Sequence, residues 1–255
     1  MLDRVLAWFS CGDASAVAAK LAVEKYGEDC EVCYCDTFAY EHPDNRRFFA
    51  DVERWLGKKI KVLSGKYADI YDVFDRTGWL IGPAGARCTT ELKKNVRIAY
   101  QRVDDTHVFG FTSEEQGRID RFRRESPEIY AEFPLMDAGL TKRDCHDRVR
   151  AAGIELPAMY RLGYRNNNCV GCVKGGSGYW NKIRVDFPDT FSKMASQERK
   201  MNVAICKKEG VTDGKRWRTP VFLDELPPDA GRYAVEPDIE CGILCIRPDV
   251  ELDLC

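Results

Sequence analysis

The sequence predicts an α/β fold with a doubly wound, mostly parallel sheet. Short apolar segments typical of buried strands alternate with amphipathic segments typical of helices. The chain also opens as a strand, a tight turn and an alanine-rich helix, at residues 5–9, 10–13 and 14–26. With 255 residues, 44% hydrophobic and 31% charged, it can bury a core of its own.

The other predicted elements follow in order along the chain. We expect strands at 31–35, 59–63 and 106–111, and helices at 43–56, 67–74, 90–102, 142–153 and 186–209. Cys30, Cys33 and Cys35 are expected as small buried residues of the second strand. Residues 136–255 are expected to form a helical and loop layer that carries a cysteine site and packs on the sheet domain of residues 1–135.

Charge, apolar runs and cysteine count indicate which partners and which compartment to expect. The net charge of -2 provides no overall positive field for nucleic acid or membranes. The chain shows neither a secretory signal nor an apolar run of about 18 residues, so we expect a cytoplasmic protein without a membrane partner. Twelve cysteines in a reducing compartment favour metal ligands or reactive thiols over disulfides. The basic stretch 207–218, with Trp217, is expected to be a solvated loop, with nucleic-acid contact as the alternative.

The first turn has the features of an anion site. Gly12 lies between a strand and a helix, where free backbone N–H groups and the helix dipole attract a phosphate or sulfate. Ser10 and Ser15 add hydroxyl donors, and Cys11 and Asp13 complete the turn. In a doubly wound sheet this position is where ligands bind.

These residues resemble a known family. The segment Phe9-Ser10-Cys11-Gly12 is similar to the Phe-Ser-Phe-Gly-type loop of sulfonucleotide reductases, within the phosphoadenylylsulfate (PAPS) reductase family of the adenine nucleotide α-hydrolase-like (PP-loop) superfamily. ATP-cleaving members carry Ser-Gly-Gly-x-Asp-Ser here, from which Cys11 and Ala14 depart. The resemblance implies that the turn binds an adenine nucleotide, either a sulfonucleotide substrate or ATP.

Two further segments carry the resemblance. Asp36-Thr37, followed by Glu41-His42-Pro43, is similar to the family's segment at the end of the second strand. Gly110-Phe111-Thr112, followed by Glu115, Arg118 and Arg121, is similar to the segment after the fourth strand. The resemblance implies that Asp36 and Gly110 line the nucleotide site. Arg118 and Arg121 are candidate bidentate partners of phosphate or sulfate oxygens, or simply exposed helix arginines.

The cysteines suggest a metal or cluster site. The strongest local signal is Cys169-Val170-Gly171-Cys172, set among asparagines and glycines in a loop that can wrap around a cluster. The resemblance implies a [4Fe-4S] cluster held by Cys88, Cys169 and Cys172, with Arg87 in place of a fourth cysteine. Candidates for the remaining iron are Cys145, Cys241 and Cys245, and a zinc site is the structural alternative.

The tail segment Ile239-Glu240-Cys241-Gly242-Ile243 is similar to the reductases' Glu-Cys-Gly motif, which implies that Cys241 is the nucleophile that attacks the substrate sulfur. The expected function is therefore sulfonucleotide reduction, with thioredoxin or glutaredoxin as reductant. The first alternative is ATP-dependent insertion of sulfur into a nucleobase or DNA backbone, with a cysteine desulfurase as donor and nucleic acid as substrate. The second is a nucleotide- or redox-sensing cluster protein without turnover. A further expected partner is a second copy of the chain, in a homodimer.

Overall fold

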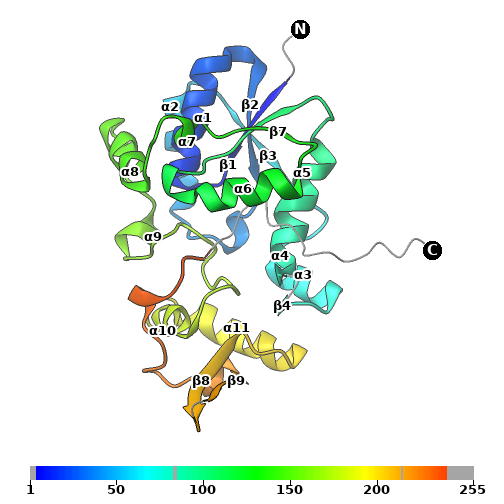
Figure 1. Cartoon of the computed structure of the whole chain (residues 1–255), viewed down its shortest axis with the longest axis vertical. Helices are drawn as coiled ribbons and strands as arrows, with labels where there is room; N and C mark the ends of the chain where they lie inside the picture. The colour runs from blue at the N-terminus through cyan, green and yellow to red at the C-terminus, as the bar shows by residue number, and fades with distance from the viewer. Residues whose placement is uncertain (1–3, 83–84, 214, 240–255) are drawn as a thin grey trace, which may run out of the picture. The chain divides into compact units, whose positions relative to one another are not determined.

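The computed structural model describes residues 4–82, 85–213 and 215–239 (Figure 1). The chain forms two compact units. Unit 1 comprises residues up to 66 together with 92–167, and unit 2 comprises 67–91 together with the chain from 168 onward. This division departs from the predicted boundary after residue 135, because 136–167 packs with the sheet and 67–91 groups with the cysteine-bearing segment.

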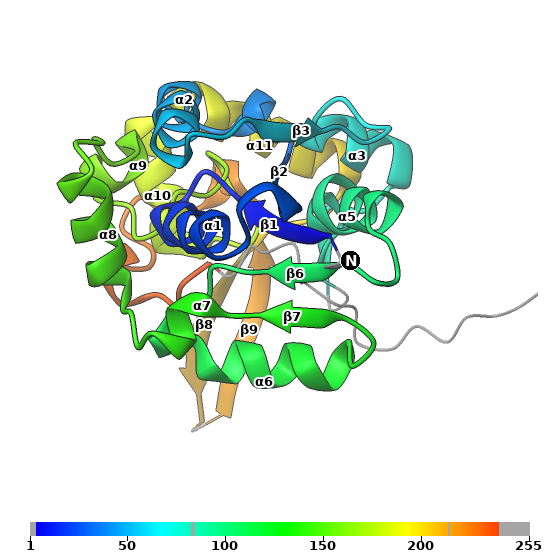
Figure 2. The same ribbon diagram turned by 90° about the horizontal axis from the view of Figure 1, so that it is seen from above.

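Unit 1 is built on a five-stranded sheet whose paired strands are all parallel. Its strands, in the order β3-β2-β1-β6-β7 across the sheet (Figure 2), are Ile60–Leu63, Cys30–Cys35, Val5–Phe9, Thr106–Val108 and Tyr130–Glu132. The predicted α/β fold with a parallel sheet is thus confirmed. The fourth strand is shorter than predicted, because the chain leaves the sheet at Phe109, and β7 was not predicted.

The helices of unit 1 complete this α/β architecture. They are α1 (Asp13–Tyr26), α2 (Asn45–Leu56), α5 (Asn95–Tyr100), α6 (Gln116–Glu125), α7 (Pro134–Asp137), α8 (Lys142–Ala151) and α9 (Ala158–Arg161). Alternate residues of β1 face a core shared with α1, α2 and α8, in which Phe9, Ala19, Phe48 and Val149 are buried. Helix α8 begins as predicted at Thr141, whose hydroxyl accepts from Asp144 N.

The side chains on the other face of the sheet belong to an aromatic cluster. Trp8 stacks with His107 at a centroid distance of 6.0 Å, and Phe109 contacts Phe122 of α6 edge-on at 5.4 Å. Trp8 Nε1 donates to His107 Nδ1 at 2.9 Å, so this buried imidazole acts as an acceptor. Burial is the main cause that lowers the pKa of His107 to about 4, and the Arg97 charge acts in the same direction.

Unit 2 contains helices and two small hairpins. Its elements are α3 (Ile70–Thr77), β4 (Ile81–Gly82), β5 (Gly85–Ala86), α4 (Arg87–Thr89), α10 (Ser177–Asp186), α11 (Pro188–Met201), β8 (Cys206–Thr212) and β9 (Lys215–Val221). A wider helical turn, Thr90–Lys94, joins α4 to α5.

Short 3₁₀ turns occur in both units. Those of unit 1 are Gly27–Asp29, Phe38–Tyr40 and Ser113–Glu115, and those of unit 2 are Leu223–Glu225 and Tyr233–Val235.

The structure corrects two predictions for this region. The helix predicted at 186–209 ends at Met201, because Asn202 adopts a left-handed conformation with φ of 52°. The basic stretch predicted as a loop is a β-hairpin, β8–β9. No helix among the described residues has both the length and the apolar character needed to cross a membrane.

Candidate functional site

The sheet order of unit 1 locates the candidate site. From β1 the sheet continues through β2 and β3 on one side and through β6 and β7 on the other, so the strand order reverses between β1 and β6. Crevices at such switch points, beyond the carboxyl ends of the strands, are where doubly wound proteins bind ligands. The loops that follow β1 and β6 meet here. A Cβ atom on Gly110 would lie 2.7 Å from Ser15 Cα and 2.8 Å from Ser15 N, so only glycine permits this approach.

The turn after β1 is organised by the Ser15 hydroxyl. Ser15 Oγ donates to Gly12 O at 2.9 Å and accepts from the backbone N–H and the hydroxyl of Ser10, both at 3.1 Å. Gly12 is the N-cap residue of α1, and no side chain caps this 14-residue helix. Its first-turn N–H groups therefore have no side-chain cap, as anion binding at a helix N-terminus requires.

Cys11 holds an unusual backbone conformation in this turn. Its φ of 55° lies in the left-handed region, where a Cβ atom costs about 1–2 kcal/mol. Glycine would avoid this cost. The buried Asn167 stabilises the turn, because its Nδ2 donates to Cys11 O at 2.7 Å and to Asn45 Oδ1 at 2.9 Å.

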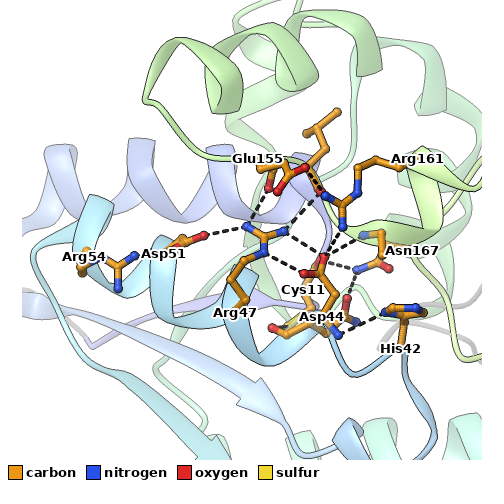
Figure 3. A network of polar contacts seen from close by, with 12 residues as sticks. Cys11, His42, Asp44, Arg47, Asp51, Arg54, Glu155, Arg161 and Asn167 are labelled. Atoms are coloured by element: carbon orange, nitrogen blue, oxygen red, sulfur yellow. Dashed lines mark hydrogen bonds and ion pairs between the residues drawn. The ribbon is translucent and has the colours of Figure 1, made fainter.

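A network of ion pairs fastens the segment 155–167 to the start of α2 (Figure 3). Arg47 pairs with Asp44 and Asp51, each at 2.7 Å, and donates to Glu155 O at 3.0 Å. Asp44 also accepts from Ala158 N at 2.8 Å. Its hydrogen bonds with Arg47 hold the pKa of Asp44 below its usual value. The network thereby positions α9 and the residues that follow it beside the turn after β1.

Asp13 is buried at the first residue of α1 and faces α8 and α9. Tyr160 Oη donates to Asp13 Oδ1 at 2.5 Å, and His146 Nε2 lies 3.1 Å from Asp13 Oδ2. Burial, followed by the Asp13 charge, raises the pKa of Tyr160 well above its ordinary value, so this tyrosine remains a neutral donor. Asp13 therefore anchors the turn to α8 and α9 as well as contributing backbone to it.

The segment after β2 brings a second set of polar groups to the same edge of the sheet. Asp36 is exposed at the end of β2, and its Oδ1 accepts from Phe38 N at 3.3 Å. Glu41 is buried, and it accepts from Tyr34 at 3.0 Å, from Thr37 at 2.5 Å and from Asn45 at 2.7 Å. The predicted Asp36 thus stands at the strand end, while Glu41 has a structural role.

The two predicted arginines lie on α6, after the loop that contains Gly110. Arg118 pairs with Glu115, and its guanidinium lies 4.4 Å from the centroid of the Phe111 ring. Arg121 is exposed on the same helix. An anion that recruits Arg118 must therefore compete with Glu115.

The CxxC loop of unit 2 is wrapped around the hydroxyl of Tyr179. Tyr179 Oη accepts from Gly171 N at 3.1 Å and from Cys172 N at 2.9 Å, and it lies 3.2 Å from Cys169 O, to which it donates. Cys169 and Cys172 are both buried. The loop approaches its own helix closely, because a Cβ atom on Gly175 would lie 2.0 Å from the Tyr179 ring.

The other predicted cysteines are distributed as follows. Cys88 lies on α4 in unit 2 and is half-buried. Cys145 is buried in the core of unit 1 against α1, as an apolar core residue. Cys241 and Cys245 lie outside the described residues. Asn168 Nδ2 donates to Ile239 O at 3.1 Å, so the last described residue is fastened next to the CxxC loop.

Within residues 4–82, 85–213 and 215–239, no group of three or more Cys, His, Asp or Glu side chains is arranged to hold a metal ion. Cys88, Cys169 and Cys172 do not form such a group among the described residues, and a cluster held by them remains a prediction.

The sequence did not point to the residues that stabilise the turn after β1. Asn45, His146 and Tyr160 belong to no motif, and Asn167 appeared only as part of a loop-forming asparagine run. Their roles come from distant segments that the fold brings together. A pattern within one segment carries no signal for such contacts.

Fold and site together define an α/β protein with a parallel sheet and an uncapped helix N-terminus at its switch point. No protein-family model matches the chain, and no curated protein matches it.

Proposed function

We propose that this protein is an enzyme that binds an adenine nucleotide at the Ser10–Ser15 turn and performs sulfur chemistry on it. The observation that carries the proposal is the turn itself. The N-terminus of α1 has no side-chain cap. Gly110 allows the loop after β6 to pack closely against the first turn of α1. Phosphate or sulfate oxygens would accept hydrogen bonds from the free N–H groups.

The proposed reaction is the reduction of a sulfonucleotide, adenylylsulfate or phosphoadenylylsulfate. The Cys241 thiolate would attack the substrate sulfur, forming a sulfur–sulfur bond while the bond from sulfur to the phosphate oxygen breaks and the nucleotide leaves. A dithiol reductant of the thioredoxin or glutaredoxin class would then attack the Cys241 sulfur. Sulfite leaves, and the resulting mixed disulfide resolves within the dithiol protein, which is oxidised.

Mass spectrometry of the intact, reduced protein after incubation with each sulfonucleotide tests this proposal. We expect an adduct of one sulfonate group on the peptide that contains Cys241, and its loss in Cys241→Ser. Cys206→Ser is the matched control, because Cys206 is buried at the base of β8. A protein that acquires no adduct with either nucleotide would contradict the proposal.

The iron–sulfur cluster remains a proposal of its own, with Cys88, Cys169 and Cys172 as ligands and Cys245 as a candidate fourth. It is supported by the CxxC loop, whose backbone is folded around Tyr179. Such a cluster would supply electrons or bind sulfur. Anaerobic preparation followed by iron, sulfide and zinc analysis distinguishes cluster from zinc. Single replacements of the three cysteines should each lower the metal content, whereas Cys145→Ala should leave it unchanged.

A second candidate function is ATP-dependent insertion of sulfur into a nucleobase or DNA backbone. It is favoured by the basic hairpin β8–β9 of unit 2, which carries exposed lysines. Release of pyrophosphate or AMP from ATP would favour this reaction over sulfonucleotide reduction. A protein that forms the Cys241 adduct and leaves ATP intact would reject it.

A further inference from the structure

The hairpin β8–β9 is the most basic feature of unit 2. Between residues 206 and 221 the sequence has five basic residues against two acidic ones, in a chain whose net charge is -2. The basic residues are Lys207, Lys208, Lys215, Arg216 and Arg218. In Figure 1 the two strands extend away from α10 and α11 of the same unit. Positive charge is therefore concentrated on a two-stranded ribbon.

Three lysines of this ribbon have no partner among the described residues. Lys207, Lys208 and Lys215 are exposed, and none forms a hydrogen bond or ion pair within the part of the chain that the structure describes. Most other lysines with a described contact, such as Lys25 and Lys59, pair with a carboxylate. Among the described residues, no intramolecular hydrogen bond or ion pair neutralises these three lysines.

Trp217 forms a flat platform on one face of the ribbon. It lies opposite Gly210, and a Cβ atom there would be 2.1 Å from Trp217 Cζ2, so the indole covers the glycine. Trp217 Nε1 donates to Thr212 Oγ1 at 3.1 Å, which fixes the ring orientation. The side chain is nevertheless 38% exposed. The inner side of the indole is thereby occupied and braced, while part of the ring remains accessible.

Strand geometry places two of the lysines on the same face as the indole. Side chains two positions apart on a strand, and those directly opposite across a pair, share a face. Lys215 precedes Trp217 by two residues, and Lys208 precedes Gly210 by two. Residues two apart on a strand are separated by about 7 Å. The indole therefore lies between two cationic groups on one surface.

We infer that the β8–β9 ribbon binds single-stranded nucleic acid, with a base stacked on Trp217 and backbone phosphates near Lys208 and Lys215. Stacked aromatic rings flanked by cations are the features by which proteins bind unpaired strands without reading their sequence. A duplex does not present its base faces to a flat indole, and an acidic polypeptide offers no ring to stack. This inference goes beyond the proposed nucleotide chemistry and does not depend on it.

Fluorescence anisotropy of the full-length protein with labelled 20-mers of oligo-dT and oligo-U tests the inference. We expect binding at low salt to both strands, weaker binding to a 20-base-pair duplex, and quenching of tryptophan emission. Trp217→Leu should lower the affinity about tenfold and abolish the quenching. Trp79→Leu is the matched control, because Trp79 is 42% exposed in unit 2, covers Gly82 in the same way and belongs to a segment, 67–92, whose sequence contains no lysine.

A salt titration tests the phosphate contacts separately. The variant Lys208→Gln/Lys215→Gln should reduce the slope of log affinity against log salt by about 1.4, since each contact on a single strand contributes about 0.7. The variant Lys25→Gln/Lys59→Gln changes the charge equally and should retain the wild-type slope. The inference is overturned by absence of binding, by equal binding of polyglutamate or anionic vesicles, by preference for duplex, or by unchanged affinity in Trp217→Leu. Binding without a Cys241 adduct would support this inference while contradicting the proposed reductase.

Discussion

Asn167 donates through Nδ2 to the carbonyl oxygen of Cys11 at 2.7 Å, and thereby joins two residues that are 156 positions apart in the sequence. Cys11 has a φ of 55°, and its side chain is completely buried. The contact holds the turn after β1 in a backbone conformation that a cysteine disfavours. The shape of the proposed anion site is therefore imposed by a distant segment of unit 1.

Replacing Cys11 by glycine or by alanine should separate backbone strain from packing. Both changes remove the thiol, but glycine also removes the Cβ atom from a left-handed residue. We expect Cys11→Gly to be more stable than Cys11→Ala by about 1 kcal/mol, measured by denaturant unfolding. Cys145 is the control, because it is equally buried but lies within α8. At this helical position, the Cys145→Gly variant should be less stable than the Cys145→Ala variant by about 1 kcal/mol. If the alanine variant were the more stable one at both positions, backbone strain at Cys11 would be disproved.

Gly110→Ala should disturb the junction between the loop after β6 and α1. The added Cβ atom would lie under 3.0 Å from three backbone atoms of Ala14 and Ser15, which cannot move without displacing the helix. We expect a loss of about 1–3 kcal/mol in unfolding free energy, together with weaker adenine nucleotide binding by calorimetry. Gly117→Ala is the control on α6, where nothing lies within 4 Å. That change should preserve nucleotide affinity and raise stability slightly, since alanine favours a helix.

The sequence predicted the parallel sheet because the period of apolar residues and the alternation of elements are local signals. Val5–Phe9 and the following helix are examples, and they place the turn that contains Gly12 between β1 and α1, as in the structure. The hairpin 206–221 was missed because its strands alternate charged side chains with few apolar ones, so their burial pattern is weak. The brace formed by Asn167, Tyr160 and His146 depends on tertiary contacts, which no local pattern encodes.

His107 should make the stability of unit 1 sensitive to acid. Its folded-state pKa of about 4 lies below the value of 6.5 expected for the unfolded chain, so the native state favours the neutral imidazole. The stabilisation is complete above pH 6.5 and is lost as the pH falls through 4, by about 3 kcal/mol in total. His107→Asn retains an acceptor for Trp8 but does not titrate. Unfolding free energies measured between pH 7 and 4 should therefore fall less steeply in the variant, and identical slopes would contradict the assignment.

Tyr179→Phe should loosen the CxxC loop without altering either thiol. The change leaves the N–H groups of Gly171 and Cys172 without their buried acceptor, and each unsatisfied group costs about 1–3 kcal/mol. We expect lower stability in denaturant unfolding and reduced iron or zinc content after anaerobic preparation. Tyr71→Phe is the matched control in unit 2, because the described residues offer its hydroxyl no hydrogen-bond partner. If both variants retained wild-type stability and metal content, Tyr179 would not organise the loop, and the case for a metal centre there would rest on cysteine spacing alone.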